Sequence, residues 1–411
     1  MPKNDNRIAV LDGIRAYAIF IIMGFHLWQQ SWMQYVIPGN ILQPFGIQNF
    51  SLVWIPRTGY MLVDTLLLLS AFCLFLPYAL KMADPLFREP DGIGLFYKKR
   101  AARIIPPYYL CLLFYVIFLI RPSDYASVGG YWKDLLAHLT FTQTFWPDTY
   151  HSTHFSTALW TLGIEVQFYL LFPFIAKLFK RYPLQMWAAM NILAELYIAL
   201  FAREADGGAD NFRINQFPAF LGVFANGMLG AVICCRLRAK LRDNSRKQIP
   251  LLATLLAFAF GIALACMLKY GLSNAAVVQR WQIDFRFLFS VLSVCFILAL
   301  DHAHKDLQWF FSCKAIRFIA AISYNLYIWH TTVMLQLKEH HIPYYPEAPA
   351  DAYAWPQSAS GEGWYHTWQN QYVLMFWVLT IILAAVLTFG FEEPLRRLLM
   401  KIGQRKQQKH I

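Results

Sequence analysis

Hydrophobic residues along the chain gather in long runs that short polar segments separate. Ten such runs lie at about 8–28, 58–80, 103–121, 158–179, 184–202, 216–236, 250–270, 283–301, 316–336 and 371–392. Each has roughly the 20 residues that a helix needs to cross the hydrocarbon core of a bilayer. The pattern therefore predicts an all-α fold: a polytopic bundle of about ten transmembrane helices, forming a single membrane domain over residues 1–411.

The composition also indicates a membrane protein, and the distribution of charged residues predicts the orientation of the helices in the membrane. Of the 411 residues 58% are hydrophobic and only 15% are charged, whereas soluble proteins carry about 25% charged residues. Most Lys and Arg side chains lie in alternate connections and at the two ends of the chain, which predicts that both termini are cytoplasmic. The net charge of +12 thus reflects topology and requires no nucleic acid. We expect a multi-pass protein of the cytoplasmic (inner) membrane, with the first run retained in the mature chain.

The two longest connections are predicted to lie outside, at about 29–57 and 337–370. The second is rich in Pro, Gly, Tyr and Trp. Its aromatic rings either stack on sugar rings of a substrate or collect at the membrane surface, as Trp and Tyr often do, and the pattern favours neither interpretation. The seven cysteines fall within runs or on the inner side and suggest neither a disulfide framework nor a metal site.

The first run carries Arg15 and His26, although ionisable groups at membrane depth are costly and usually functional. Eleven residues correspond to about three helical turns, so the two side chains share a face and lie roughly 16 Å apart along the axis. Asp12 precedes Arg15 by three residues and could hold its guanidinium. The structural alternatives are an arginine that reaches the inner interface and a hydrogen-bonded core histidine.

Other runs place further polar groups in the outer half of the membrane. Asp64 lies in the second run, Glu165 in the fourth and His330 near the outer end of the ninth. Together with His26, these side chains are predicted to form one outward-facing polar pocket, because each would be costly to bury alone. Ser70 and Tyr324 lie on the same runs as Asp64 and His330. The alternative is a purely structural polar network.

A second candidate site lies on the cytoplasmic side. In "YKKRAARIIPPYYL", Arg100 and Arg103 stand one turn apart just before the third run, and Pro106 and Pro107 suit the first turn of a helix. Two arginines that point the same way form a fork that matches phosphate groups. Ordinary anchoring of a cytoplasmic loop accounts for the same residues equally well.

Six stretches in order carry a family resemblance. These are "LDGIRAYAIFIIMGFH", "VDTLLLLSAF", "RAAR" with "IIPPYYL", "LWTLGIEVQFYLLFP", "ISYNLYIWH" and "FEEPLRR". The chain resembles the integral-membrane acyltransferase family 3, whose members O-acylate lipopolysaccharide, peptidoglycan and other glycans. It departs from the family pattern at Ala71, where glycine is usual, and at Val166, where a second glutamate is common.

The resemblance implies a membrane O-acyltransferase that uses cytoplasmic acyl-CoA as a co-substrate, with no permanently bound cofactor and no metal. The acyl group, acetyl or succinyl, would pass to a hydroxyl of a glycan or glycolipid. Arg15, Arg100 and Arg103 would hold the donor, and His26 would act as general base with Glu165. A covalently acylated His26 is the rival mechanism.

The remaining polar residues would support the site. They are Asp12, Asp64, Ser70, Tyr324 and His330. Family members often carry an additional hydrolase-like domain outside the membrane, and we expect this chain to act alone or with a separate partner. The oligomeric state stays open.

Two other functions remain open from the sequence. One is acylation of a small molecule or an antibiotic by the same chemistry. The other is proton-coupled transport, which also uses buried Glu and His residues. Inverted repeats and broken helices, which are typical of transporters, are not apparent in the sequence.

Overall fold

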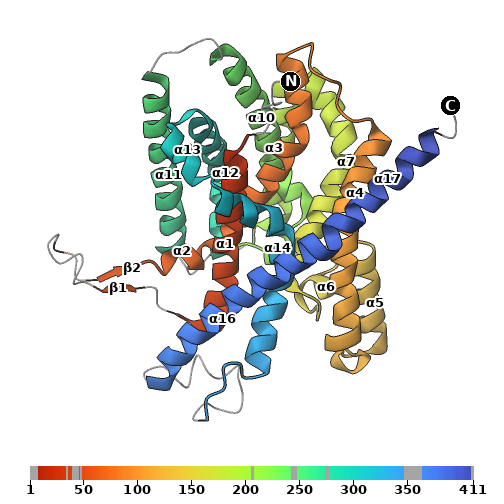
Figure 1. Ribbon diagram of the computed structural model, residues 1–411, viewed down its shortest axis with the longest axis vertical. Coiled ribbons are helices and arrows are strands. Elements are labelled where there is room, and N and C mark those ends of the chain that lie inside the picture. Colours follow the sequence, from red (N-terminus) through yellow and green to blue (C-terminus); the bar gives the residue numbers. More distant parts are fainter. Residues whose placement is uncertain are drawn as a thin grey trace.

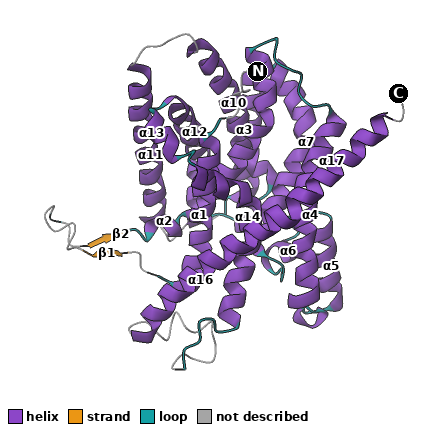
Figure 2. Cartoon of the chain, viewed as in Figure 1, coloured by secondary structure: helices purple, strands orange, loops and turns teal. Residues whose placement is uncertain are grey.

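The computed structural model describes residues 8–33, 36–38, 46, 49–204, 208–241, 248–273, 278–346 and 363–408. Within these ranges the chain is almost entirely helical, and the short strands lie apart from the bundle (Figure 2). Nine helices of the described part are long and apolar enough to cross a membrane. The predicted all-α polytopic bundle is thus confirmed, while the orientation of its termini stays a prediction.

The ten predicted runs correspond to ten long helices. These are α1 (Val10–Ser31), α3 (Leu62–Ala83), α4 (Ile93–Phe114), α7 (Trp160–Arg181), α8 (Pro183–Tyr197), α10 (Leu221–Leu241), α11 (Gln248–Ser273), α12 (Val278–His302), α14 (Lys314–Glu339) and α16 (Gly363–Leu387). Figure 1 shows α11 at one edge of the bundle and α4 and α7 toward the other. Many apolar side chains of α11 are exposed, among them Leu251, Leu255 and Ile262, as expected of a helix that faces lipid.

Shorter elements extend or connect these helices. The short α-helices are α2 (Trp54–Arg57), α5 (Val128–Leu139), α6 (Pro147–His151), α9 (Asn211–Ile214) and α13 (Lys305–Phe310), and α17 (Glu393–Gln408) follows α16. The 3₁₀ turns are η3 (Gly59–Met61), η5 (Pro122–Asp124), η6 (Thr157–Leu159) and η8 (Phe217–Phe220), and the π turns are η4 (Tyr115–Leu119), η7 (Ile198–Ala202) and η11 (Thr388–Glu392). The strands β1 (Val36–Pro38) and β2 (Asn49–Ser51) pair antiparallel.

The ninth predicted run forms α14, but this helix is less apolar than the other nine. It has 26 residues, which correspond to about 39 Å and suffice to span a bilayer. The polar side chains in its central part are buried and α14 packs between α1 and α16, so they face protein instead of lipid. The buried polar residues of this helix include Ser323, Asn325, His330, Thr331 and Thr332. A span of this kind is typical of a helix that carries a site.

The third run begins earlier than predicted. Helix α4 starts at Ile93, ten residues before the expected boundary, so Arg100 and Arg103 lie inside the helix and Pro106 and Pro107 occupy its interior. Lys, Arg and Ala are strong helix formers, and they extend the helix through the polar segment. The prediction that the two prolines start this helix is therefore wrong.

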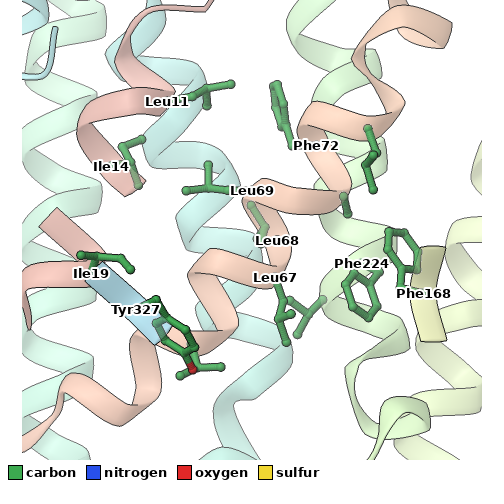
Figure 3. Packing of buried hydrophobic residues seen from close by; sticks show 14 of the residues in the cluster. Leu11, Ile14, Ile19, Leu67, Leu68, Leu69, Phe72, Phe168, Phe224 and Tyr327 are labelled. Atoms are coloured by element: carbon green, nitrogen blue, oxygen red, sulfur yellow. The ribbon is translucent and has the colours of Figure 1, made fainter. Parts of the chain in front are cut away.

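The core forms where α1, α3, α7 and α10 meet (Figure 3). The rings of Phe168 on α7 and Phe224 on α10 stack with their centroids 3.9 Å apart. Gly227 lets α10 approach α3 closely, because a Cβ at this position would lie 2.4 Å from the carbonyl oxygen of Leu68. Small residues at such contacts are characteristic of helix packing in membranes.

Candidate active site

A cavity of about 320 Å³ lies between helices α1, α3, α4, α7 and α14. Figure 1 shows these helices from the centre to the right of the bundle. Six of the residues predicted for the site line it: Arg15, Ser70, Arg100, Arg103, Glu165 and Tyr324. The structure thus brings together side chains from five helices that are distant in sequence. Apolar side chains of α3 complete the wall.

Three arginines give the cavity an excess of positive charge. Within the described part of the chain, none of them has a carboxylate oxygen within 4.0 Å. Arg15 instead donates a hydrogen bond to Cys73 Sγ at 3.8 Å. The Arg100 guanidinium lies 5.9 Å from the ring of Phe96, and its Nε is buried without a hydrogen-bond partner among the described residues. Guanidinium groups without a carboxylate partner are chemically suited to bind an anion.

Glu165 is held by hydroxyl groups. Its Oε1 accepts hydrogen bonds from Ser70 Oγ at 2.7 Å and from the hydroxyl of Tyr169, one helical turn away on α7. His26 is not among its partners, although the sequence suggested that Glu165 orients the His26 imidazole. The Glu165 carboxylate therefore lines the same cavity as Arg15, Arg100 and Arg103, which we call the arginine cavity.

The two histidines lie next to each other instead. The ring centroids of His26 and His330 are 5.2 Å apart, and the planes are inclined by 43°. His330 is fully buried and its Nδ1 lies 2.8 Å from the carbonyl oxygen of Tyr327, whereas His26 is half-buried. Neither histidine lines the arginine cavity.

Tyr327 connects the histidine pair to the cavity. Its side chain lines the cavity, and its hydroxyl accepts a hydrogen bond from Thr161 at 2.9 Å. One turn earlier on α14, Tyr324 donates to the carbonyl oxygen of Ile104 on α4, next to Arg103. Tyr324, Tyr327 and His330 follow one another along α14 at three-residue intervals, and the ring centroids of Tyr327 and His330 lie 5.8 Å apart.

Asp64 belongs to a separate ion pair. Its Oδ2 accepts a hydrogen bond from Arg286 Nε at 2.9 Å, and both side chains are buried. Arg286 also donates to the carbonyl oxygen of Ile214, and its guanidinium lies 4.2 Å from the ring centroid of Phe220. The predicted single pocket of two histidines and two carboxylates is therefore not observed. Depth along a helix can be read from the sequence, but the direction in which the side chain points is set by packing.

Asp12 lies in the first turn of α1, one turn before Arg15 as its spacing predicted. The Arg15 guanidinium reaches Cys73 on α3 and makes no ion pair with Asp12. Asp12 is not among the residues that line the cavity.

Several polar residues of the site were not singled out from the sequence. Tyr169 follows Glu165 by four residues, and this spacing alone indicates that both side chains lie on one face of α7. Asn325 Nδ2 donates to Glu392 Oε2 at 2.8 Å and to Thr388 Oγ1 at 2.9 Å, which fastens α14 to the π turn after α16. Asn325 and Glu392 lie within stretches that carried the family resemblance. Residues 347–362 of the aromatic connection at 337–370, for which sugar stacking and a membrane-surface belt were both open, lie outside the described residues.

Comparison with known proteins identifies relatives among acyltransferases. The acyltransferase MdmB of Streptomyces mycarofaciens is 26% identical over 222 residues, which cover 53% of this chain and 50% of that protein. The O-acetyltransferase OatA of Staphylococcus aureus is 24% identical over 345 residues, and the peptidoglycan O-acetyltransferase OatA of Listeria monocytogenes is 24% identical over 357 residues. Each of the latter two matches covers 81% of this chain and 51% of the relative.

The chain thus spans about half the length of the curated relatives it matches. No solved structure matches significantly. The profile of a family described as an acyltransferase domain matches residues 8–387, nearly the whole chain. The protein is therefore a member of the integral-membrane acyltransferase family 3, in agreement with the resemblance seen in its sequence.

Proposed function

We propose that this protein moves a short acyl group, acetyl or succinyl, from cytoplasmic acyl-CoA to a hydroxyl of a cell-surface glycan or glycolipid. The observation that carries the proposal is the cavity with three arginines that have no carboxylate partner in the described structure. Family membership supports acyl transfer over proton-coupled transport. The names of the two O-acetyltransferase relatives support acetyl as the group, and the peptidoglycan in the name of the Listeria protein supports a glycan as the acceptor.

The cavity suits the donor end of this reaction. Coenzyme A carries several phosphate charges, and arginine binds phosphate through two parallel hydrogen bonds. Arg100 and Arg103 lie one turn apart on α4, so both guanidinium groups can approach one ligand from the same side. Arg15 adds a third cation from α1, and the apolar side chains of α3 provide a wall for the arm that carries the thioester.

His26 is the proposed base. The acceptor oxygen attacks the thioester carbonyl carbon while His26 takes the hydroxyl proton. The C–O bond forms, the C–S bond breaks, and the leaving thiolate takes the proton back from the imidazolium. Histidine suits this step because its ordinary pKa lies near neutrality. His26 is partly exposed, whereas His330 is fully buried.

Covalent transfer through His26 is the alternative order of events. In that case a His26 nitrogen attacks the thioester first, coenzyme A leaves, and the acceptor hydroxyl attacks the acyl-imidazole. Trapping of a labelled acyl-protein in the absence of acceptor distinguishes this order from direct transfer.

The experiment that tests the proposal is release of coenzyme A from acetyl-CoA and succinyl-CoA by the purified protein in lipid nanodiscs. We expect slow release by the wild type and a loss of about 10²–10⁴-fold in His26→Ala. Arg317→Ala is the matched control, because Arg317 is exposed and does not line the cavity. A wild-type protein that neither binds nor cleaves either donor would contradict the proposal.

A further inference from the structure

The two ring nitrogens of His330 differ in their surroundings. Nδ1 lies 2.8 Å from the carbonyl oxygen of Tyr327. A carbonyl oxygen only accepts hydrogen bonds, so Nδ1 carries the proton and Nε2 of the neutral ring presents a lone pair. Nε2 is buried and has no hydrogen-bond partner among the described residues. A buried acceptor left without a partner is unfavourable and calls for an explanation.

The imidazole of His26 lies next to His330 and carries a nitrogen that can donate to Nε2. Its ring centroid lies 5.2 Å from that of His330. The two residues that follow His330 on α14 already have partners on other segments. Thr331 Oγ1 lies 2.7 Å from Ser156 Oγ, and Thr332 Oγ1 lies 2.8 Å from the hydroxyl of Tyr115.

The carboxylates that might have served a catalytic histidine are engaged elsewhere. Asp64 pairs with Arg286, and Glu165 accepts hydrogen bonds in the arginine cavity. In many hydrolases a carboxylate behind the histidine fixes its tautomer. A neutral imidazole can accept the same hydrogen bond, and it does so without placing an unpaired charge in the membrane interior.

We infer that His330 is a positioning residue for His26: a rotation of the His26 side chain lets one of its nitrogens donate a hydrogen bond to His330 Nε2, and the other His26 nitrogen then takes the proton of the acceptor hydroxyl. The inference rests on the proposed function of His26 as the base. His330 neither gains nor loses a proton in the cycle. The proton passes from the hydroxyl to His26 and then to the leaving thiolate, while the hydrogen bond to His330 is kept.

Two substitutions separate this role from simple packing. Methionine at position 330 fills a similar volume without a strong acceptor, and glutamine offers an amide oxygen at about the reach of Nε2. If His330 only fills space, His330→Met should retain activity and His330→Gln should be the poorer variant. Positioning predicts the reverse: kcat falls at least about tenfold in His330→Met with an unchanged KM for the donor, and His330→Gln recovers part of it.

Thermal unfolding of both variants shows whether a loss reflects misfolding. A His330→Met protein that is as stable and as active as the wild type would overturn the inference. If His330→Met does not fold, the activity of His330→Gln and the spectroscopic measurement described next test the inference. The spectroscopic measurement uses protein in which His330 is intact.

A direct measurement does not depend on turnover. In protein labelled with ¹⁵N-histidine, the His330 signals are assigned by their absence in His330→Gln. We expect a ring protonated at Nδ1 and an Nε2 resonance that shifts when His26 is replaced by glutamine. A His330 ring protonated at Nε2, or an Nε2 resonance that does not change in His26→Gln, would refute the hydrogen bond between His26 and His330. If the signal responds but no acyl-CoA is turned over, the proposed donor fails while the histidine pair stands.

Discussion

Ser70 Oγ lies 2.7 Å from Glu165 Oε1, so a hydroxyl of α3 and a carboxylate of α7 meet across 95 residues of sequence. Tyr169 donates a second hydrogen bond to the same oxygen. These contacts hold the carboxylate in a cavity that also contains Arg15, Arg100 and Arg103. Glu165 therefore moderates the positive potential of the cavity, since it is the one carboxylate that the described residues contribute to the lining.

Replacing Glu165 by glutamine should strengthen binding of coenzyme A. Glutamine keeps an acceptor oxygen for Ser70 and Tyr169 but removes the negative charge from the cavity. We expect the Kd to fall by about threefold to tenfold, which corresponds to ~1 kcal/mol at an intermediate dielectric constant. Isothermal titration with coenzyme A measures the change. An unchanged or weaker affinity would show that the phosphates bind away from Glu165.

Replacing Arg100 or Arg103 should weaken the same affinity. Hydrogen bonds to charged groups contribute about 1.5–3 kcal/mol each, so Arg100→Ala or Arg103→Ala should raise the KM for acyl-CoA by about 10–100-fold. Arg103→Lys should recover only part of the loss, because lysine keeps the charge but not the planar fork. Arg317→Ala controls for the loss of an exposed cation. A KM that is unchanged in the Arg100→Ala, Arg103→Ala double variant would exclude these side chains from donor binding.

The sequence located the membrane helices better than it located their contacts. Runs of apolar residues predicted α1 and α3 closely, because a bilayer sets the length of a helix that crosses it. The start of α4 at Ile93 was not foreseen, because Lys and Arg continue a helix as readily as they end a hydrophobic run. Hydropathy registers the loss of apolar side chains but not the continuation of the backbone.

The sequence also did not predict which polar side chains contact one another. Ionisable residues in the runs indicated that a site exists, and the structure does bring Arg15 and Glu165 into one cavity. Glu165, however, accepts a hydrogen bond from Ser70 and not from His26, and Asp64 forms an ion pair with Arg286. Partners across the bundle depend on how each helix is rotated, and the hydropathy of a nearly uniform span such as α3 carries little information on that rotation.

The Asp64–Arg286 pair should be important for stability. Asp64→Asn leaves Arg286 as a buried cation without its partner, which typically costs about 3–5 kcal/mol. The double variant Asp64→Leu, Arg286→Leu should recover much of this loss, because no unpaired charge remains. Chemical unfolding in detergent measures both. Lys133→Ala breaks the exposed Lys133–Asp148 pair and should cost only about 0–1 kcal/mol.

An equal loss in Asp64→Asn and Lys133→Ala would contradict this account. So would a double variant that is less stable than Asp64→Asn alone. Activity per folded molecule should change little in the double variant, because neither Asp64 nor Arg286 lines the arginine cavity.

Cys73 offers a test of the charge inside the cavity. Its thiol lines the cavity beside the Arg15 guanidinium, whereas Cys111, Cys234 and Cys235 are buried in protein. In a variant that keeps Cys73 as its only cysteine, an anionic methanethiosulfonate should react faster than its cationic counterpart. The three arginines attract the anion, and reagents of equal size differ only in the sign of their charge.

Coenzyme A should slow this modification, because donor and reagent would compete for the same space. A variant that keeps only Cys313 provides the control, since Cys313 is partly accessible but does not line the cavity. There we expect no protection by coenzyme A and a smaller preference for the anion. Protection of Cys73 by coenzyme A but not by an uncharged pantetheine would assign the effect to the phosphates and hence to the arginines. Equal reaction of both reagents at Cys73 would instead mean that the cavity is electrically neutral, and the donor site would have to lie elsewhere.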